Sequence, residues 1–409
     1  MADGREKQRV AAAAEMRDTT KMPRCVTTKM REPSSTKTTG SMEEHLKNTH
    51  FVSTTQSAFL SVSTQYYLLR DGRSHRLRHE AREVGEIGPL DGQTMRPLAT
   101  TTALVGGLSA CYIASNLFRQ RQRAQHGVVT TLYRYLRLRY HLRDLSKVII
   151  IADFDRTLTT AMCKTSCHGV VESCAGLSAS YRNLTTKLTE HYLPIEMDPA
   201  IPRAEKIPLM QEWYRRAHEL LLQEPFTPAL LESAVRESRI ALRPGCDELL
   251  AGCHDRGVPV VVMSAGLGNV IKSVMGQRLT PGTAAKVVPS LPIVSNWLLF
   301  DVQDQVCGFS EPLLHMFNKD GCFIETQLAE RWPQLSKGRH TILLLGDGLG
   351  DAHMADGFER SHTILKVGFL NEQEDARVAA RLAQYEEAFD AVILADQPFG
   401  WLLNGLLRW

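Results

Sequence analysis

The sequence has almost no excess of charge of either sign, and it has few cysteines. Its 409 residues include 48 Lys and Arg against 45 Asp and Glu, which gives a formal net charge of +3. Such a small surplus gives no reason to expect a nucleic-acid polymer as a partner. The nine cysteines are an odd number spread along the chain. They indicate a reducing compartment rather than a disulfide framework.

The chain also lacks the usual targeting signals. No apolar run lies near Met1, so no signal peptide is expected, and Glu6, Glu15 and Asp18 interrupt the basic start, which argues against a mitochondrial address. We therefore expect a cytoplasmic catalytic domain. With 43% apolar and 23% charged residues, the composition excludes a wholly disordered chain, a collagen and a multi-span membrane protein. The length allows two or three domains of roughly 100–200 residues each.

The N-terminal part differs in composition from the rest. Residues 1–50 are rich in Thr, Ser, Lys, Arg and Met and have no sustained apolar period. Residues 51–95 add one short apolar stretch and a basic run. Such segments bury too little surface to offset the entropy lost on ordering, so we predict a mostly disordered extension over 1–95.

Residues 98–118, LATTTALVGGLSACYIASNLF, carry no charge over 21 positions and are followed by RQRQR. That length and the flanking cations are compatible with a membrane anchor whose basic end is cytoplasmic. The Thr, Ser, Gly and Asn residues equally favour a small-residue helix packed on the domain. Both interpretations stay open for the region 96–146, which ends in a predicted basic amphipathic helix over 132–145.

From residue 147 onward, short apolar runs of strand length alternate with helical stretches. The runs are KVIIIADFD (147–155), PVVVMSAG (259–266), HTILLLGDG (340–348), HTILKVGFL (362–370) and AVILAD (391–396). Continuous apolar strands alternating with helices predict a parallel sheet that is buried on both faces. Ligands of such sheets bind at the carboxyl ends of the strands.

The first two runs are separated by about 100 residues of helical character. Helices are predicted over 176–192, 204–224 and 228–240, with breaks that contain proline between them. The predicted fold is therefore α/β, with a Rossmann-like parallel sheet core and an inserted α-helical cap domain. The core comprises 147–160 and 257–409, and the cap comprises 161–256.

The clearest chemical signal is D-x-D-x-T-L after the first strand. Asp153 and Asp155 can point into one crevice, where two carboxylates repel each other unless a cation or a proton intervenes. Mg²⁺ suits such a site, because it binds carboxylates, water and phosphate oxygens. One Asp can then attack as a nucleophile while the other moves protons. The alternative is a loop with capping aspartates.

Three further pieces follow other predicted strands or lie in adjoining loops. Ser264 and the backbone of Ala265 precede a glycine at a predicted helix N-terminus, a geometry that binds phosphate or merely caps the helix. Lys319 could offset a phosphoryl dianion, or lie exposed in its loop. Asp347 and Asp351 in G-D-G-L-G-D follow LLL and suit a metal site or a glycine-rich turn.

Taken in order, these pieces resemble the haloacid-dehalogenase phosphatase superfamily. The strings PIEMDP, EWYRRAHELL, VVMSAGLGNVI, KVVPSLPIVSNWLLFD, HMFNKDG and ILLLGDGLGDAHMADG resemble the cytosolic 5′-nucleotidase III, or pyrimidine 5′-nucleotidase, family, from about residue 147 to the C-terminus. Some members of that family carry an N-terminal hydrophobic anchor.

The resemblance implies a role for each residue of the site. Asp153 is the nucleophile and forms an aspartyl-phosphate, and Asp155 protonates the leaving ribose oxygen and then activates water. Mg²⁺ is held by Asp153, the backbone carbonyl of Asp155, and Asp347. The implied phosphate ligands are Ser264 and Lys319, with Asp351 as a water-mediated metal ligand and Thr157 capping or orienting the loop.

The cap is expected to set substrate specificity. Glu196 matches the family position that contacts the base, although by itself it resembles a surface Glu before a proline break. Trp213 and Tyr214 can stack on a base or form the apolar face of a helix. Ala217 replaces a Ser that often contacts nucleotide in the family, which puts base selectivity in doubt.

One cysteine-rich group has spacing that suggests a metal. Cys163, Cys167, His168 and Cys174 lie close in sequence, but C-x₃-C-H is not a standard zinc pattern and no second ligand pair follows. We favour a buried thiol cluster.

The leading hypothesis is a Mg²⁺-dependent 5′-nucleotidase that hydrolyses nucleoside 5′-monophosphates, with CMP and UMP as the expected substrates. A related phosphatase acting on N7-methyl-GMP or another small phosphomonoester is the first alternative. The second is a catalytically silent scaffold that binds a membrane or a partner through the N-terminal region. A monomer is favoured.

Overall fold

The computed structural model describes residues 95–198 and 200–407, with side chains from residue 111 onward. The predicted disordered extension therefore lies, up to residue 94, outside the described residues. The part of the chain from Arg96 to Trp409 clusters as one compact unit.

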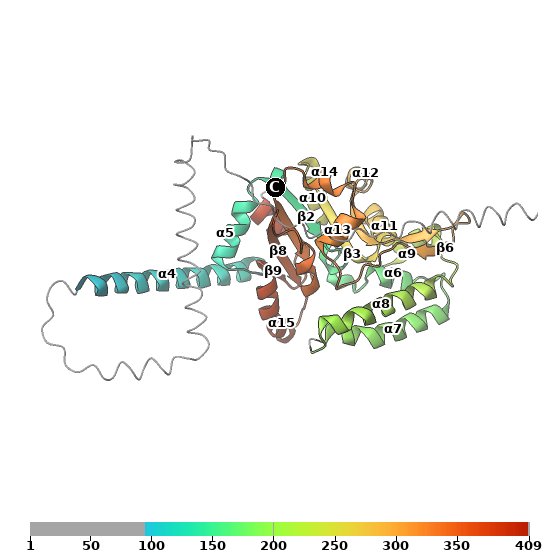
Figure 1. The fold of residues 1–409 in the computed structure, drawn as a ribbon, viewed down its shortest axis with the longest axis horizontal. Coiled ribbons are helices and arrows are strands. Elements are labelled where there is room, and N and C mark those ends of the chain that lie inside the picture. The colour runs from blue at the N-terminus through green and yellow to red at the C-terminus, as the bar shows by residue number, and fades with distance from the viewer. Residues whose placement is uncertain (1–94, 199, 408–409) are drawn as a thin grey trace, which may run out of the picture. The chain divides into compact units, whose positions relative to one another are not determined.

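A seven-stranded sheet forms the centre of this unit (Figure 1). Its strands follow the order β1-β9-β8-β7-β2-β3-β4, and every neighbouring pair is parallel except β1 with β9. The prediction of a parallel sheet is thus confirmed, and all five predicted strands are present. The strands are β1 (Val128–Val129), β2 (Val148–Ala152), β3 (Val260–Leu267), β4 (Ile293–Asn296), β7 (Thr341–Gly346), β8 (Thr363–Leu370) and β9 (Ala391–Leu394).

Helices cover both faces of the sheet, which explains why its central strands β2 and β7 are almost wholly apolar and buried at every position. Alternate side chains of β2 enter two different cores: Val148 and Ile150 pack with α10 and α11, whereas Ile149 and Ile151 pack with α13 and α14. A third cluster joins α15 to β8 and β9. The helices outside the β2–β3 connection are α4 (Met95–His126), α5 (Leu132–His141), α11 (Gly268–Arg278), α12 (Pro281–Val287), α13 (Gly321–Gln327), α14 (Trp332–Ser336) and α15 (Asp375–Ala388).

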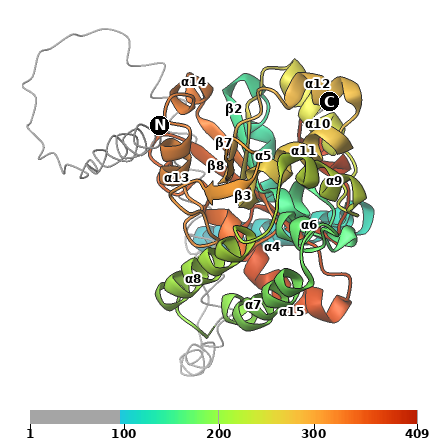
Figure 2. The same ribbon diagram turned by 90° about the vertical axis from the view of Figure 1, so that its right-hand side faces the viewer.

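Five helices lie between β2 and β3, as the predicted insertion requires. They are α6 (Cys167–Glu172), α7 (Ala179–Met197), α8 (Arg203–Leu221), α9 (Pro228–Glu237) and α10 (Cys246–Asp255). Helices α7 and α8 lie side by side (Figure 2) and contact each other extensively, whereas α6 contacts β3, α9 contacts α11 and α10 contacts α12. A β-hairpin, β5 (Leu298–Phe300) with β6 (Val306–Phe309), contacts α8. The cap boundaries at 161 and 256 stay a prediction.

One predicted helix end is wrong. Helix α7 continues through Pro194 to Met197 instead of ending near residue 192, and the predicted break follows it, because α8 begins at Arg203. An interior proline is unfavourable in a helix, but tertiary packing can override this preference, and α7 packs along α8. Asp198 closes the last turn of α7 by donating its N–H to the carbonyl of Pro194 at 3.0 Å. Glu196 therefore lies on a helix and not in a loop.

The segment 98–118 lies within α4. Among the described residues, no helix combines the length and apolar character needed to cross a membrane, so the anchor interpretation is not supported. The C-terminal part of α4 packs on the domain: the Phe118 ring lies 5.1 Å from that of Tyr135, Arg119 pairs with Glu386 at 2.7 Å, and Gln122 accepts a hydrogen bond from Trp401. The Thr, Ser and Gly residues of the segment account for its low apolarity.

Candidate active site

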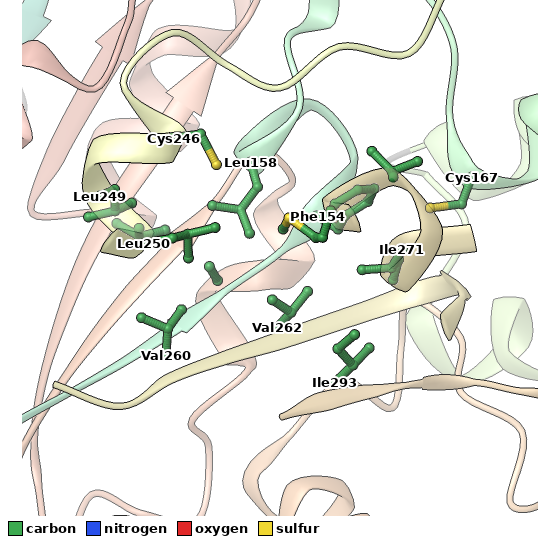
Figure 3. Close-up of a cluster of buried hydrophobic side chains, with 14 of the residues drawn as sticks. Phe154, Leu158, Cys167, Cys246, Leu249, Leu250, Val260, Val262, Ile271 and Ile293 are labelled. Atoms are coloured by element: carbon green, nitrogen blue, oxygen red, sulfur yellow. The ribbon is translucent and has the colours of Figure 1, made fainter. Parts of the chain in front are cut away.

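The first strand of the predicted core delivers Asp153 to the carboxyl edge of the sheet. Asp153 follows β2, is 6% exposed, and donates its N–H to the carbonyl of Leu345 on β7 at 2.9 Å. A tight turn, Phe154–Leu158, comes next. Phe154 and Leu158 extend into the apolar core near Val262 (Figure 3). This anchoring leaves Asp155 to face the polar side with Asp153.

Three carboxylates from two chain regions meet at this edge. One carboxylate oxygen each of Asp153, Asp347 and Asp351 lies within 4.8 Å of the other two. Asp347 follows β7, and Asp351 lies in the short 3₁₀ helix Leu349–His353. Gly346 permits the approach, since a Cβ at this position would lie 2.2 Å from that of Asp351. Residues almost 200 positions apart thus form one acidic cluster.

Lys319 lies inside the cluster and is 2% exposed. Its Nζ donates to Asp153 Oδ1 at 2.7 Å and to Asp351 Oδ1 at 2.6 Å. Burial alone would lower the pKa of Lys319, but Asp153 and Asp351 outweigh it and raise that pKa above its ordinary value. Lys319 is therefore a fixed cation at the centre of the site.

One lysine does not balance three carboxylates, of which two are buried and that of Asp347 is half-buried. Burial raises the pKa of Asp153 to about 7, with Asp351 adding to the rise and Lys319 opposing it. Burial, reinforced by Asp153 and Asp351, also raises the pKa of Asp347 well above its ordinary value. A divalent cation would relieve this repulsion, and three carboxylates are the hard oxygen donors that Mg²⁺ prefers. The donor set therefore fits the predicted magnesium ion.

Asp155 occupies a separate position beside the cluster. Its Oδ1 accepts a hydrogen bond from the N–H of Cys167, the first residue of α6, at 2.9 Å. Burial raises the pKa of Asp155 to about 6, although the hydrogen bonds from Cys167 oppose the rise. A carboxyl group of that pKa exchanges protons readily near neutral pH, as a general acid and base must.

Ser264 and Ala265 are buried near the carboxyl end of β3, inside the strand. The prediction that they directly precede a helix N-terminus is wrong, because the strand continues to Leu267 and α11 begins at Gly268. The Ser264 hydroxyl accepts the N–H of Gly266 at 3.1 Å. A Cβ at Gly266 would lie 2.8 Å from the Cβ of Cys167 and 3.2 Å from Ser264 Oγ, so only glycine allows these neighbours to approach. Ser264 is thus near Cys167, which also contacts Asp155.

The predicted stacking residues face different surroundings. Trp213 stacks on Tyr192 of α7, with ring centroids 5.7 Å apart and planes inclined by 13°. Tyr214 lies edge-on to His168 at 5.6 Å. Burial raises the pKa of Tyr214, and Glu196 and Asp155 add to that rise. Of the two aromatic residues, Tyr214 is thus the one that senses the charges of Glu196 and of the carboxylate site, whereas Trp213 packs within the α7–α8 pair.

Glu196 and Thr157, two further residues of the predicted site, differ in burial and in their partners. Glu196 is half-buried, and burial raises its pKa while Lys206 opposes the rise. Thr157 is fully buried, and its hydroxyl has no hydrogen-bond partner. The Thr157 carbonyl accepts a 2.7 Å hydrogen bond from Arg243, so its backbone, rather than its hydroxyl, is held in place.

The cysteine-rich group does not gather metal ligands. Over the described ranges, the acidic cluster is the sole set of three or more candidate ligands close enough to share an ion. Cys167 and Cys174 are instead part of the main apolar core.

Three residues at the site carried no clear sequence signal. Arg243 and Asn371 contact the turn after Asp155, and Tyr385 donates its hydroxyl to the carbonyl of Asp347. Asn371 directly follows β8, so the rule that placed Asp153 and Asp347 at strand ends could have found it. Arg243 and Tyr385 are separated from their partners by too much chain for spacing to reveal them.

A parallel α/β sheet that brings D-x-D, a lysine and two further aspartates together at its carboxyl edge defines a haloacid-dehalogenase-like phosphatase. The pyrimidine 5′-nucleotidase (UMPH-1) family model matches residues 155–408. The chain belongs to this family. It is therefore a 5′-nucleotidase-type phosphoric monoester hydrolase, and the silent-scaffold alternative is not supported.

Individual relatives agree with this assignment. The 7-methylguanosine phosphate-specific 5′-nucleotidase of Gallus gallus is 37% identical over 269 residues, which are 64% of this chain and 88% of that protein. The putative cytosolic 5′-nucleotidase 3 of Caenorhabditis elegans is 34% identical, over 61% of this chain and 66% of that protein. A crystal structure of cytosolic 5′-nucleotidase IIIB bound to cytidine superposes with a TM-score of 0.55 at 32% identity, covering 65% of this chain and 86% of that one.

Proposed function

We propose that this protein is a magnesium-dependent 5′-nucleotidase that hydrolyses nucleoside 5′-monophosphates to nucleoside and phosphate through an aspartyl-phosphate at Asp153. The observation that carries the proposal is the cluster of Asp153, Asp347 and Asp351 around a single buried lysine. Such an excess of buried negative charge is costly for folding and useful for chemistry on a phosphate that arrives with a divalent cation.

The two carboxylates of the D-x-D motif divide the reaction. Asp153 attacks phosphorus, and Asp155 donates its proton to the leaving 5′-oxygen of the ribose. Asp155 then takes a proton from the water that hydrolyses the phosphoryl group from Asp153. Two easier displacements thus replace one difficult displacement. The raised pKa of Asp155, about 6, suits a group that must both give and accept a proton.

The remaining residues bind and orient. Asp153, Asp347 and the backbone carbonyl of Asp155 would hold Mg²⁺, with Asp351 close enough to bind directly or through water. The ion, when bound, supplies positive charge that reduces the repulsion between phosphate and carboxylates. Lys319 offers its ammonium to phosphoryl oxygens, and Ser264 with the Ala265 backbone offers hydrogen-bond donors.

Two kinds of base are candidates for the nucleotide substrate, a pyrimidine and N7-methylguanine. The family description and the cytidine complex of the structural neighbour favour CMP and UMP. The names of several relatives favour N7-methyl-GMP. We propose that Glu196 and Tyr214 contact the base in either case, because the Tyr214 hydroxyl, whose pKa burial raises, is close enough to Glu196, Asp155 and Asp153 for their charges to add to that rise.

Phosphate release tests the proposal directly. Purified full-length protein is assayed with CMP, UMP, AMP and N7-methyl-GMP, each with Mg²⁺ and with EDTA. We expect hydrolysis of CMP and UMP, of N7-methyl-GMP, or of both, and loss of that hydrolysis in EDTA. Asp153→Asn should be inactive, and Asp304→Asn, on an exposed loop, is the matched control. Activity that survives Asp153→Asn would refute the nucleophile, and activity on none of the four would refute the substrate class.

A further inference from the structure

The turn that carries Asp155 is held from behind by one buried arginine. Arg243, in the segment between α9 and α10, is 1% exposed. Its Nε donates to the carbonyl of Thr157 at 2.7 Å, and its Nη2 donates to the carbonyl of Arg156. A single guanidinium thus binds two consecutive carbonyls of the turn that follows Asp155.

Arg156 adopts a backbone conformation that needs such support. Its φ of 60° lies in the left-handed region, which is unfavourable for a residue with a side chain. The Arg156 N–H donates to Thr159 Oγ1 at 2.8 Å, and its carbonyl accepts a second hydrogen bond from Asn371 Nδ2 at 2.9 Å. Hydrogen bonds to both the N–H and the carbonyl of Arg156 therefore maintain the turn.

Asn371 and Arg243 act as one unit. The Asn371 Oδ1 accepts a hydrogen bond from Arg243 Nη2 at 3.0 Å, so the amide, the guanidinium and the Arg156 carbonyl bind one another. Asn371 follows β8, at the same edge of the sheet as Asp153 and Asp347. The turn is thereby tied to a strand that lies two positions from β2 in the sheet.

A buried carboxylate secures the other end of the unit. Asp396 pairs with Arg243 at 2.9 Å, and both side chains are buried. The Asp396 carboxylate also accepts the N–H groups of Ala161 at 3.0 Å and Met162 at 3.1 Å. The chain is therefore fixed at 156–157 and again at 161–162, on either side of the short stretch between them.

From this geometry we propose that Arg243 and Asn371 are positioning residues for the phosphoryl-transfer reaction: they fix the Arg156 carbonyl and so hold the Asp155 carboxylate in place relative to Asp153. The inference rests on the proposed function. Neither residue touches the reacting atoms. Displacement of a reacting group by about 1 Å can lower the rate by about 10²-fold, which makes the turn a sensitive element.

Two substitutions test the inference by steady-state kinetics on the best substrate of the full-length protein. Asn371→Ala removes one of the two donors to the Arg156 carbonyl, and we expect kcat to fall about 10-fold with KM changed less than about threefold. Arg243→Lys keeps the cation beside Asp396 but cannot reach both carbonyls and Asn371. We expect it to lower kcat by up to about 10²-fold.

Arg134→Lys is the matched control. Arg134 also donates to two backbone carbonyls, those of Glu386 and Phe389, but it lies on α5 and takes no part in the turn. We expect its kcat to remain at the wild-type value. A kcat at the wild-type value in both Asn371→Ala and Arg243→Lys, or a rise in KM without a fall in kcat, would overturn the inference.

A second measurement separates this inference from the proposed function. Hydrogen exchange of the amides of residues 156–163 should be faster in Asn371→Ala than in the wild type and in Arg134→Lys, with exchange of β2 and β7 unchanged. If the wild type hydrolyses none of the substrates, the proposed function fails and the exchange comparison decides whether Arg243 and Asn371 hold the turn. Equal exchange in all three proteins would overturn that claim.

Discussion

Two ionic clusters lie at the turn that follows β2, and they differ in their balance of charge. Asp153 of the first cluster directly precedes this turn, and Arg243 of the second cluster donates hydrogen bonds to two carbonyls within it. Around Lys319, one ammonium faces three carboxylates. Around Arg243, one guanidinium faces one carboxylate, and backbone carbonyls and Asn371 take its other donors. The second cluster is satisfied by the protein alone. The first has three carboxylates beside one lysine, an excess that a divalent cation or a proton can offset. This excess makes it the candidate active site.

The largest contrast is expected from removing a carboxylate of the unbalanced cluster. Asp347→Asn removes a half-buried carboxyl group whose ionised form is disfavoured by Asp153 and Asp351. We expect hydrolysis to fall by at least about 10²-fold, while the free energy of unfolding without Mg²⁺ stays the same or rises. Kinetics and urea denaturation of the same preparation check both parts. A marked loss of stability would show that Asp347 has a structural role.

For the balanced cluster around Arg243, we expect a substitution to lower the free energy of unfolding. Arg243→Leu leaves Asp396 buried and unpaired, and breaking a buried ion pair in this way typically costs about 3–5 kcal/mol. Urea denaturation should show that loss. Arg134→Leu, a half-buried arginine at the surface of α5, is the control and should cost far less. An equal loss in the two variants would remove the distinction between the clusters.

An effect of intermediate size on thermal stability is expected from magnesium binding at the carboxylate cluster. A ligand at 100 times its Kd stabilises the folded state by about 2.7 kcal/mol. We expect Mg²⁺ to raise the Tm of the wild type and to leave that of Asp347→Asn almost unchanged. The Arg134→Lys protein should respond as the wild type does. A similar shift in Asp347→Asn would place the ion elsewhere.

The smallest effect concerns two half-buried histidines, His168 and His218, whose charged forms are disfavoured. Burial lowers the pKa of His168 to about 4 and that of His218 to about 3, and His218 Nε2 has no hydrogen-bond partner. A depressed pKa means that the unfolded chain binds the proton more tightly, so the free energy of unfolding should fall as the pH drops from about 6.5 toward 4. The slope is at most about 1.4 kcal/mol per pH unit for each histidine.

His218→Phe isolates one of these groups. The His218 ring stacks on Phe309 with centroids 3.6 Å apart, and phenylalanine can retain that contact. We expect urea denaturation of this variant between pH 7 and pH 4 to show a shallower loss of stability than the wild type. Identical pH profiles would show that His218 does not titrate in this range.

The sequence predicted much of the sheet and of the carboxylate cluster. Strands that are largely apolar along their whole length can be recognised without tertiary information, because both faces of a parallel sheet are covered. Asp153 and Asp347 then follow from the rule that ligands bind at the carboxyl ends of strands. Their proximity is a property of the topology rather than of any local signal.

The errors and omissions have physical causes. Propensity predicts that α7 ends before Pro194, but the packing of α7 along α8 outweighs the cost of a proline inside the helix. The segment 98–118 was open to two interpretations because the absence of charge and the dilution by small residues point in opposite directions. Arg243 was missed because its partners are about 90 to 150 residues away, where spacing carries no information.

The most direct test of the central claim is a crystal structure of the full-length protein with Mg²⁺ and a beryllium fluoride phosphoryl mimic. We expect the mimic on an Oδ atom of Asp153 and one magnesium ion bound by Asp153 and Asp347, with Lys319 directed toward the fluorides. An ion bound without Asp153 and Asp347, or a mimic attached elsewhere, would contradict the account.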